Sequence, residues 1–185
     1  MSTPKADELS NAFGFITLNE VAAVHRLCQL LPPDPIAINI GAGVGTSGLT
    51  MLESRSDLTL FTIDARKEVD SQGALKNEQI ALENAGYYDT TRYTQIHGDS
   101  KEVGKNWDKG KVNLVFIDGL HNYEQCTADI LEWLPHIVEG GIIAAHDYAL
   151  PWPQVRKAID EQLVDKYEQI LHMDSVIAFW VKHDV

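Results

Sequence analysis

A chain of 185 residues is long enough for one domain with a continuous hydrophobic core and short for two, so we expect a single domain spanning residues 1–185. The formal net charge of −12 would repel the phosphates of a nucleic acid, which argues against DNA and RNA as substrates. Hydrophobic residues make up 44% of the chain, as in ordinary globular proteins, but no apolar run approaches the ~20 residues of a membrane-spanning helix, so we expect no membrane partner.

The first 34 residues precede the first predicted strand. The opening MSTPKADELS has no apolar segment after its basic residue, so we expect no secretory signal. Apolar residues from Leu18 to Leu31 recur at helical spacing until two prolines, which predicts an amphipathic helix. Cys28 in this pattern and Cys126 further on are expected to be buried free thiols of a cytoplasmic protein. Residues 1–34 suit a helical cap or lid, or a homodimer contact, and nothing in them distinguishes these roles.

Five short apolar runs follow between residues 35 and 145. Most are bounded by Gly, Asp or Asn, as is typical of strands that are covered on both faces in a parallel sheet. The predicted strands are Ile36–Ile40, Leu58–Ile63, Tyr93–His97, Val112–Ile117 and Gly141–Ala145. Helical patterns alternate with them, notably over Leu75–Ala85, over Asn122–Leu134, and through Val155, Ile159 and Leu163 after Pro151 and Pro153. This alternation predicts an α/β fold.

The C-terminal segment breaks the alternation. Glu168–Met173 and Val176–Val181 read as two strands separated only by Asp174 and Ser175. A connection of two residues calls for an antiparallel hairpin, because a parallel return needs a long crossover. The sequence therefore predicts a mostly parallel sheet with an antiparallel strand at its end.

A glycine-rich loop joins the first predicted strand to the next helix. Gly41, Gly43 and Gly45 allow sharp turns and let a ligand approach backbone N–H groups at a helix N-terminus. Asp64 ends the second strand about 20 residues beyond the loop, where a carboxylate can accept hydrogen bonds from ribose hydroxyls. The loop alone would also suit a tight turn without a ligand. Together with Asp64, it favours a ligand that contains a nucleoside.

Dinucleotide-binding loops space their glycines as Gly-x-Gly-x-x-Gly, whereas the third glycine here comes one residue early. With the closing hairpin and the lack of a separate substrate domain, residues 35–182 resemble the class I methyltransferases that depend on S-adenosylmethionine. The resemblance implies a Rossmann-like three-layer sandwich with a seven-stranded, mostly parallel sheet. It also implies that the loop wraps the methionine part of the cofactor and that Asp64 binds the ribose.

The same resemblance covers three further cofactor positions. His97-Gly98-Asp99-Ser100 is similar to the family's motif after strand three, where an acidic side chain meets the adenine amino group; Asp99 matches it, and Ser100 beside it is expected to bind the cofactor as well. Asn39 stands where many members have an acid. Its amide can accept a hydrogen bond from the cofactor's ammonium group but offers it no charge partner.

Polar residues gather after the fourth and fifth predicted strands. Asp118 and His121 lie in FIDGLHNYE, and His146 and Asp147 follow GGIIAA. Because ligands of open α/β sheets bind at the carboxyl ends of the strands, we expect these four side chains to converge. Two carboxylates with imidazoles suit a divalent cation. The alternatives are that Asp118 only caps the following helix and that one histidine is structural.

These two segments resemble the branch that includes macrocin and mycinamicin sugar O-methyltransferases and the cephalosporin-hydroxylase-related proteins. The resemblance implies a magnesium ion on Asp118 and Asp147, with His121 as general base. His146 stands where those enzymes have Glu, and an imidazole ligand there would shift the preference from magnesium toward manganese, iron or zinc.

The expected function is metal-assisted O-methylation of a hydroxyl on a small molecule such as a sugar or polyol. The sequence leaves His121 open as general base or direct metal ligand, and Trp152 as wall of the acceptor pocket or as packing. Two other functions stay open: an NAD(P)-linked oxidoreductase that uses the same glycine loop, and a non-catalytic cofactor-binding module.

Overall fold

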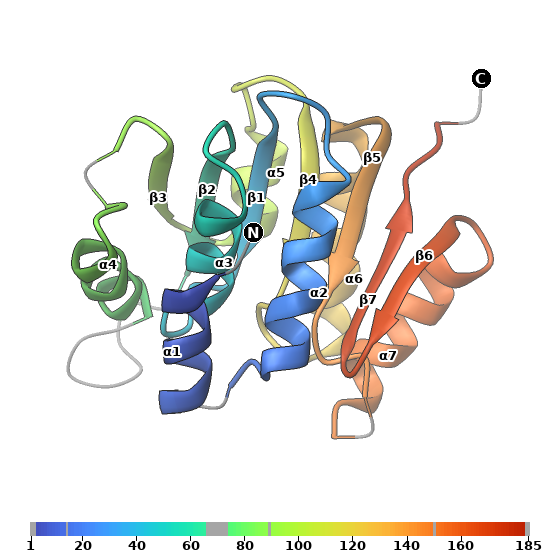
Figure 1. The fold of residues 1–185 in the computed structure, drawn as a ribbon. Coiled ribbons are helices and arrows are strands. Elements are labelled where there is room, and N and C mark those ends of the chain that lie inside the picture. The colour runs from blue at the N-terminus through green and yellow to red at the C-terminus, as the bar shows by residue number, and fades with distance from the viewer. Residues whose placement is uncertain (1–2, 14, 66–73, 89, 150, 184–185) are drawn as a thin grey trace.

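In the computed structural model, which describes residues 3–13, 15–65, 74–88, 90–149 and 151–183, seven strands form one sheet in the order β3-β2-β1-β4-β5-β7-β6 (Figure 1). The strands are β1 (Ile36–Ile40), β2 (Thr59–Asp64), β3 (Tyr93–His97), β4 (Val112–Ile117), β5 (Ile137–Ala145), β6 (Glu168–Met173) and β7 (Val176–Trp180). The helices are α1 (Pro4–Phe13), α2 (Leu18–Gln29), α3 (Thr46–Ser54), α4 (Ala74–Ala85), α5 (Ser100–Lys105), α6 (Tyr123–Trp133) and α7 (Pro153–Ile159).

Strand directions confirm the predicted fold class. β1 to β5 pair in parallel, whereas β7 runs antiparallel to β5, and β6 antiparallel to β7. β5 begins at Ile137, four residues before its predicted start at Gly141, because a register shift against β4 accommodates Gly140 at φ +71°. α7 continues beyond Ile159 as a π-helical turn over Asp160–Val164, so the predicted pattern through Leu163 stays helical.

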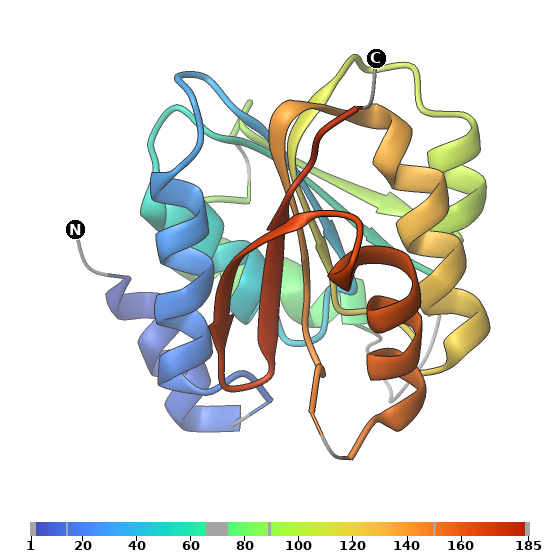
Figure 2. The same ribbon diagram turned by 90° about the vertical axis from the view of Figure 1, so that its right-hand side faces the viewer.

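Helices cover both faces of the sheet (Figure 2). α1, α2 and α3 lie on one face, and α5, α6 and α7 lie on the other. Because side chains alternate along a strand, neighbouring residues of β1 enter different cores: Ala37 packs on the α2 side and Ile38 on the α6 side. Both residues are fully buried, as expected for a strand between two helical layers.

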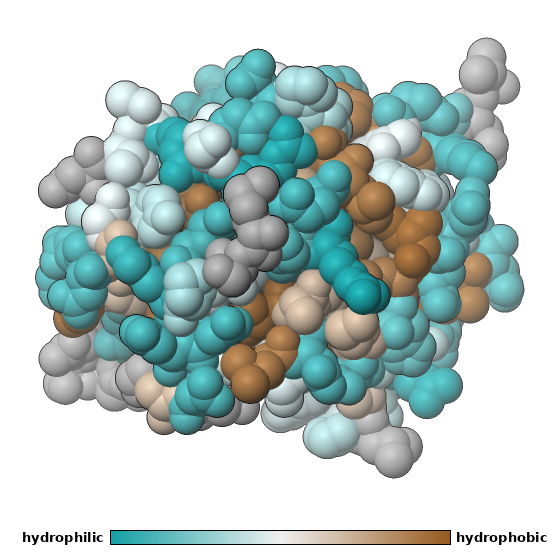
Figure 3. Space-filling view, in the orientation of Figure 1, coloured by the Kyte–Doolittle hydropathy of each residue, from teal (hydrophilic) through white to brown (hydrophobic). Residues whose placement is uncertain are grey.

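The face that carries α1 to α3 is mainly hydrophilic (Figure 3). Its hydrophobic surface gathers chiefly between α2 and the β6–β7 hairpin. Ile170, Leu171 and Trp180 of this hairpin are partly buried and pack against the core on the α2 side. α2 contacts α3 and β6, and α1 packs mainly against α2 and α3. Among the helices of the described residues, none is long and apolar enough to cross a membrane.

Candidate active site

The glycine loop after β1 crosses the end of β4. Gly41 has φ +96°, and a Cβ at this position would lie 2.0 Å from the carbonyl oxygen of Asp118, so only glycine fits. Its N–H donates to the carbonyl of Ile63 at 2.9 Å. Gly45, at φ +97°, is the N-cap of α3. Gly43 has φ +52°, and a Cβ there would meet no atom of the described residues within 4 Å, so this part of the loop is open.

Two acidic residues expected at the cofactor are fixed by backbone groups. Asp64 ends β2, is 5% exposed, and accepts a hydrogen bond at Oδ2 from the N–H of Ala42 at 2.9 Å. Asp99 is the N-cap of α5 and accepts from the N–H groups of Lys101 and Glu102 at 2.9 and 3.4 Å. Asp64 therefore ties the glycine loop to β2, and Asp99 opens α5.

A cavity of about 250 Å³ joins residues from both halves of the sheet edge. Gly41, Asp64, Asp99 and Ser100 line one part of it, and His121 lines another. The structure thus brings four of the predicted cofactor residues and the predicted base around one space. Gly43 and Gly45 shape the loop, and the cavity lining consists of other residues.

Asn39 and Ser100 use polar atoms inside the protein. Asn39 is fully buried and its Nδ2 donates to the carbonyl of Gly41 at 3.1 Å. Its Oδ1 is buried and has no hydrogen-bond partner among the described residues. An acceptor left in this state costs about 1–3 kcal/mol, so it is suited to a donor from a ligand. The hydroxyl of Ser100 donates to Asp129 of α6, although Ser100 also lines the cavity.

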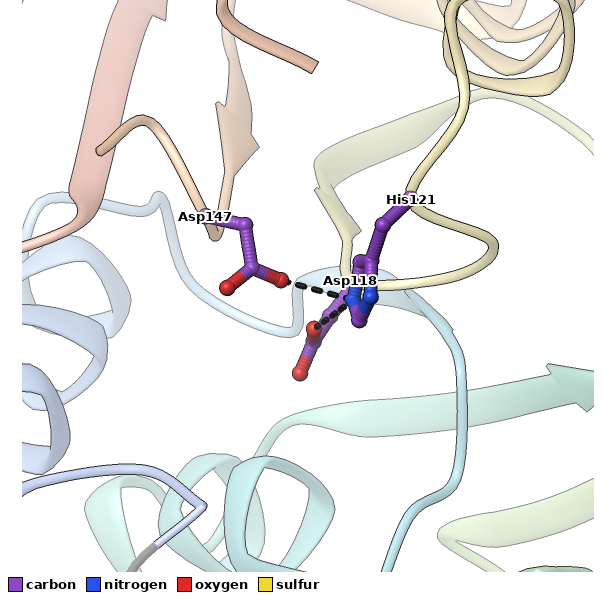
Figure 4. A group of neighbouring side chains, drawn as sticks. All are labelled: Asp118, His121 and Asp147. Carbon is purple, nitrogen blue, oxygen red and sulfur yellow. Dashed lines mark ion pairs between the residues drawn. The ribbon is translucent and has the colours of Figure 1, made fainter. Parts of the chain in front are cut away.

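Asp118, His121 and Asp147 come from the loops after β4 and β5 and point toward one another (Figure 4). The Nε2 atom of His121 lies 2.7 Å from Oδ2 of Asp147 and 4.0 Å from Oδ1 of Asp118. One ligand atom from each of the three residues lies within 4.8 Å of the others, which is close enough to share a cation. The ring of Trp152 lies against that of His121, with 4.2 Å between the centroids.

The backbone of Asp147 is left-handed. Its φ of +61° is uncommon for a residue other than glycine, although Asp and Asn tolerate it better than most. This conformation ends β5 and turns the carboxylate toward the loop after β4. Such strained backbone clusters at functional sites.

His146 lies on the side of the site that faces α2. Strand alternation explains this, because Ala144 packs in the α2-side core and His146 follows it by two residues. The Nδ1 atom of His146 lies 3.1 Å from Oδ2 of Asp147 and 3.4 Å from Oδ1 of Asp118. Its Nε2 atom lies 3.3 Å from Oε2 of Glu20. The compact three-residue group therefore contains His121 where the sequence pattern favoured His146, and the ligand role of His146 stays a prediction.

Carboxylates determine the charge of both histidines. Hydrogen bonds from its ring to the carboxylates of Asp118 and Asp147 raise the pKa of His121 to about 9. Burial alone would lower the pKa of His146, but the surrounding carboxylates raise it to about 12. Burial opposes the charge of Asp147, yet the two imidazoles hold the pKa of this carboxyl below its usual range. Without a cation, the site is thus a network of carboxylates balanced by two imidazolium groups.

Glu20 of α2 is a neighbour of this site that the sequence patterns did not indicate. Glu20 is 4% exposed and completes a capping box with Thr17, whose side chain accepts from the Glu20 N–H. The Thr-x-x-Glu spacing was visible in the sequence and predicts a helix start. The contact with His146 has no local signal, because it joins residues 126 positions apart.

Glu78 of α4 is a second buried acidic residue that the sequence patterns did not indicate, and it lies near the glycine loop. Thr62, Tyr93 and Gln95 all donate hydrogen bonds to its carboxyl group. Its side chain lies under the N-terminus of α3, where a Cβ on Gly48 would meet Oε1 at 2.6 Å. Burial raises the pKa of Glu78 to about 7.

Comparison with protein families places residues 38–148 in the family described as a methyltransferase domain. The match begins in β1 and extends past Asp147, so it includes the glycine loop, Asp64, Asp99 and the group around Asp118. The sequence matches no curated protein.

Solved structures share this fold. O-methyltransferase TomG from Streptomyces achromogenes, involved in tomaymycin synthesis and determined in complex with S-adenosylmethionine, has a TM-score of 0.75 and 16% identity over 98% of this chain and 89% of its own. A Staphylococcus aureus protein assigned as a caffeoyl-CoA O-methyltransferase has a TM-score of 0.73 and 17% identity over 99% and 93%. TDP-rhamnose 3′-O-methyltransferase CalS11, an enzyme in calicheamicin biosynthesis, has a TM-score of 0.68 and 17% identity over 93% and 84%. At these identities, the likeness establishes the fold.

Proposed function

The chain belongs to the methyltransferase-domain family as a class I enzyme that depends on S-adenosylmethionine, and from this premise we propose that it methylates a hydroxyl group of a small molecule with the help of a divalent cation. One observation carries the proposal. The cavity of about 250 Å³ extends from the predicted cofactor residues to His121, which in turn contacts Asp147. Family membership also favours methyl transfer over the oxidoreductase and over a non-catalytic module.

The cofactor half of the cavity fits S-adenosylmethionine. Gly41 brings the loop backbone close to the cavity, Asp64 lies at its edge, and Asp99 lies beside the adenine position that the family resemblance implies. Asn39 supports the assignment because its buried Oδ1 lacks a partner among the described residues and could accept from the ammonium group of the cofactor. TomG, whose fold is similar, was determined in complex with this same cofactor.

The acidic pair fits a divalent cation. Asp118 and Asp147 supply the carboxylate oxygens that hard cations prefer, and His121 and His146 each place a nitrogen within 2.7 to 3.1 Å of the Asp147 carboxylate. When bound there, a divalent cation would lower the pKa of a neighbouring hydroxyl and orient it. Manganese, iron and zinc accept imidazole more readily than magnesium does, so we keep all four metals as candidates.

His121 is proposed as the general base. Its imidazole lines the cavity, and if a cation took up the Asp147 carboxylate that now pairs with Nε2, this nitrogen would be released and could face an acceptor hydroxyl. In the metal-free protein, the carboxylates keep this ring protonated, with a pKa of about 9. A cation bound to Asp118 and Asp147 would lower the pKa of His121 again, so that its ring could accept a proton near neutral pH. Such a base typically contributes ~10²–10⁴ in rate.

The proposed reaction is a single displacement. The acceptor oxygen forms a bond to the methyl carbon, the bond from that carbon to sulfur breaks, and the electron pair stays on sulfur as S-adenosylhomocysteine. The hydroxyl proton goes to His121 Nε2. The sulfonium already makes the methyl group electrophilic, so the main tasks of the chain are to align the two reactants and to remove this proton.

A small-molecule acceptor is favoured over a nucleic acid. The net charge of −12 would repel the long phosphate backbone of a nucleic acid, whereas CalS11, with the same fold, is described as a TDP-rhamnose 3′-O-methyltransferase, an enzyme that methylates a sugar. Trp152 is 39% exposed and lies against His121, so it can form a flat wall for a sugar or polyol at the mouth of the site.

Calorimetry with S-adenosylmethionine and S-adenosylhomocysteine tests the cofactor assignment. We expect micromolar binding, and Asp64→Ala should weaken it by about 1.5–3 kcal/mol because the lost hydrogen bonds have a charged acceptor. Transfer of a labelled methyl group to a panel of sugars and polyols, with and without a chelator, tests the rest. A folded protein that binds neither cofactor form, or that keeps full activity in excess chelator, would contradict the corresponding part of the proposal.

A further inference from the structure

Glu20 lies on α2, outside the loops that carry the site, yet its carboxylate reaches into it. Oε2 of Glu20 lies 3.3 Å from Nε2 of His146. Both side chains are nearly buried, with 6% of Glu20 and 7% of His146 exposed. The contact is an ion pair by distance, without hydrogen-bond geometry at Nε2, and water screens the attraction between two such buried charges less than it would on the surface.

The carboxylate of Glu20 is fixed on two further sides. Oε2 accepts a hydrogen bond from the N–H of Thr17 at 2.8 Å, within the capping box of α2. Oε1 accepts from the N–H of Ser175 at 3.1 Å and also from its hydroxyl. Ser175 belongs to the turn between β6 and β7, and Thr17 Oγ1 donates to Asp174 in the same turn at 3.2 Å. Figures 1 and 2 show α2 beside this hairpin.

His146 is thereby held at both ring nitrogens. Nε2 faces Glu20, while Nδ1 lies within 3.4 Å of oxygens from both Asp118 and Asp147. A carboxylate at the outer nitrogen of a histidine fixes its ring orientation, as outer-sphere carboxylates do for histidines in metal sites. Burial opposes the charge of Glu20, but His146 and Ser175 together lower its pKa to about 2, so the group is anionic.

We propose that Glu20 is a positioning residue, which holds the imidazole of His146 against Asp118 and Asp147 and makes α2 a fixed wall of the active site. This role goes beyond the proposed function, since it rests on side-chain contacts that form without a cation. It also assigns a task to the N-terminal segment, which the sequence left open between a lid and a dimer contact.

A purely structural role for Glu20 is the competing explanation, because the same carboxylate caps α2 and holds the hairpin turn. Thr17→Ala is a matched control for it. This change removes the side-chain half of the capping box and the contact with Asp174, at a cost of about one helix cap, but leaves the contact between Glu20 and His146. Glu20→Gln removes the charge that faces His146.

Manganese binding to the whole protein, measured by calorimetry without substrate, compares these variants. We expect Glu20→Gln to weaken Mn²⁺ binding about 10- to 100-fold, the usual effect of losing an outer-sphere partner. Thr17→Ala should change it less than about twofold, and both variants should bind S-adenosylhomocysteine like the wild type. Unchanged Mn²⁺ affinity in Glu20→Gln, or an equal loss in Thr17→Ala, would overturn the positioning role.

A second readout separates this role from the metal proposal. In NMR spectra of the metal-free protein, we expect a slowly exchanging Nε2–H signal from His146, assigned by its absence in His146→Gln. The signal should be unchanged in Thr17→Ala, and it should shift or exchange faster in Glu20→Gln, where the facing group is uncharged; an unchanged signal in Glu20→Gln would refute the positioning role. A wild type that shows the signal but binds no Mn²⁺ would refute the metal site alone. If Glu20→Gln does not fold, Glu20→Asp, which withdraws the charge by one methylene, should shift both readouts in the same direction.

Discussion

The two halves of the site edge are built in different ways. On the cofactor side, backbone groups anchor the polar side chains: Asp64 binds the N–H of Ala42, and Asp99 caps α5. On the side of Asp118, the side chains hold one another. His146 lies between Asp147 and Glu20, and His121 pairs with the same Asp147.

This difference predicts how each half responds to change. A side chain that is anchored by backbone N–H groups can be altered with mainly local consequences. In a network of side chains, removing one member leaves the others with unbalanced charge, so effects are expected to be non-additive. The structure therefore predicts local behaviour around Asp64 and Asp99 and cooperative behaviour around Asp147.

Asp147→Asn should have the largest effect on activity, because it disrupts the network of side chains around Asp118 (the network side) and leaves the cofactor side intact. Asn tolerates the left-handed backbone at this position, so the change removes charge without new strain. We expect methyl transfer to fall by ~10³-fold, which corresponds to the several kcal/mol that a cation and its ligands supply. Affinity for S-adenosylhomocysteine, measured by calorimetry, should stay within about twofold, because the residues that we propose to hold the cofactor are anchored by backbone groups away from Asp147. A parallel loss of cofactor affinity would show that the two halves are not separable.

Gly41→Ala should act through the backbone, at the point where the glycine loop meets the loop after β4. The new Cβ would lie 2.0 Å from a backbone oxygen, at φ +96°, so we expect a loss of ~3 kcal/mol or more in unfolding free energy. Gly43→Ala is the matched control, because no atom of the described residues lies within 4 Å of its Cβ, and it should cost ~1–2 kcal/mol. Chemical denaturation measures both. Equal losses of unfolding free energy in the two variants would show that the steric clash with the Asp118 carbonyl does not contribute.

The two histidines of the network side should make the stability of the protein depend on pH in alkaline solution. His121 and His146 have pKa values raised to about 9 and about 12, whereas the unfolded chain releases both protons near 6.5. Between pH 7 and 9, the folded metal-free protein therefore binds more protons, and its stability should fall as pH rises. His121→Gln removes one of the two groups and should reduce that slope to about half near pH 8. A slope unchanged by the substitution would exclude His121 as its source.

Glu78, which packs beside the glycine loop, should instead make stability depend on pH in acid solution, and this is the smallest effect that we expect. Burial raises the pKa of Glu78 to about 7, while an unfolded glutamate releases its proton near 4.5. The contribution of this group to stability should therefore be greatest below pH 4.5 and fall as pH rises through 7. Glu78→Gln should flatten this decline in thermal unfolding, with a remainder from Asp129, whose pKa burial raises to about 6. An identical decline in the variant would contradict the assignment to Glu78.

Local patterns in the sequence were sufficient to predict most of the fold and to single out several residues that line one part of the cavity. The run Ile36–Ile40 with its glycine loop, and Asp64 at the end of the next strand, carry their own signals. The α2-side direction of His146 also follows from alternation along β5. The contact between Glu20 and His146 could not be predicted, because it depends on how α2 packs beside the hairpin. The early start of β5 likewise depends on a register shift against β4 that no local pattern reveals.

Paramagnetic relaxation tests whether the two halves of the site converge on one reaction. S-adenosylmethionine carrying a ¹³C-labelled methyl group is bound to the protein, and its NMR signal is followed as Mn²⁺ is added. If the cation binds at Asp118 and Asp147 beside the cavity, the methyl signal should broaden strongly in the wild type and stay sharp in Asp147→Asn at the same Mn²⁺ concentration. A methyl signal that stays sharp in the wild type with both ligands bound would place the metal and the methyl donor apart and contradict the account.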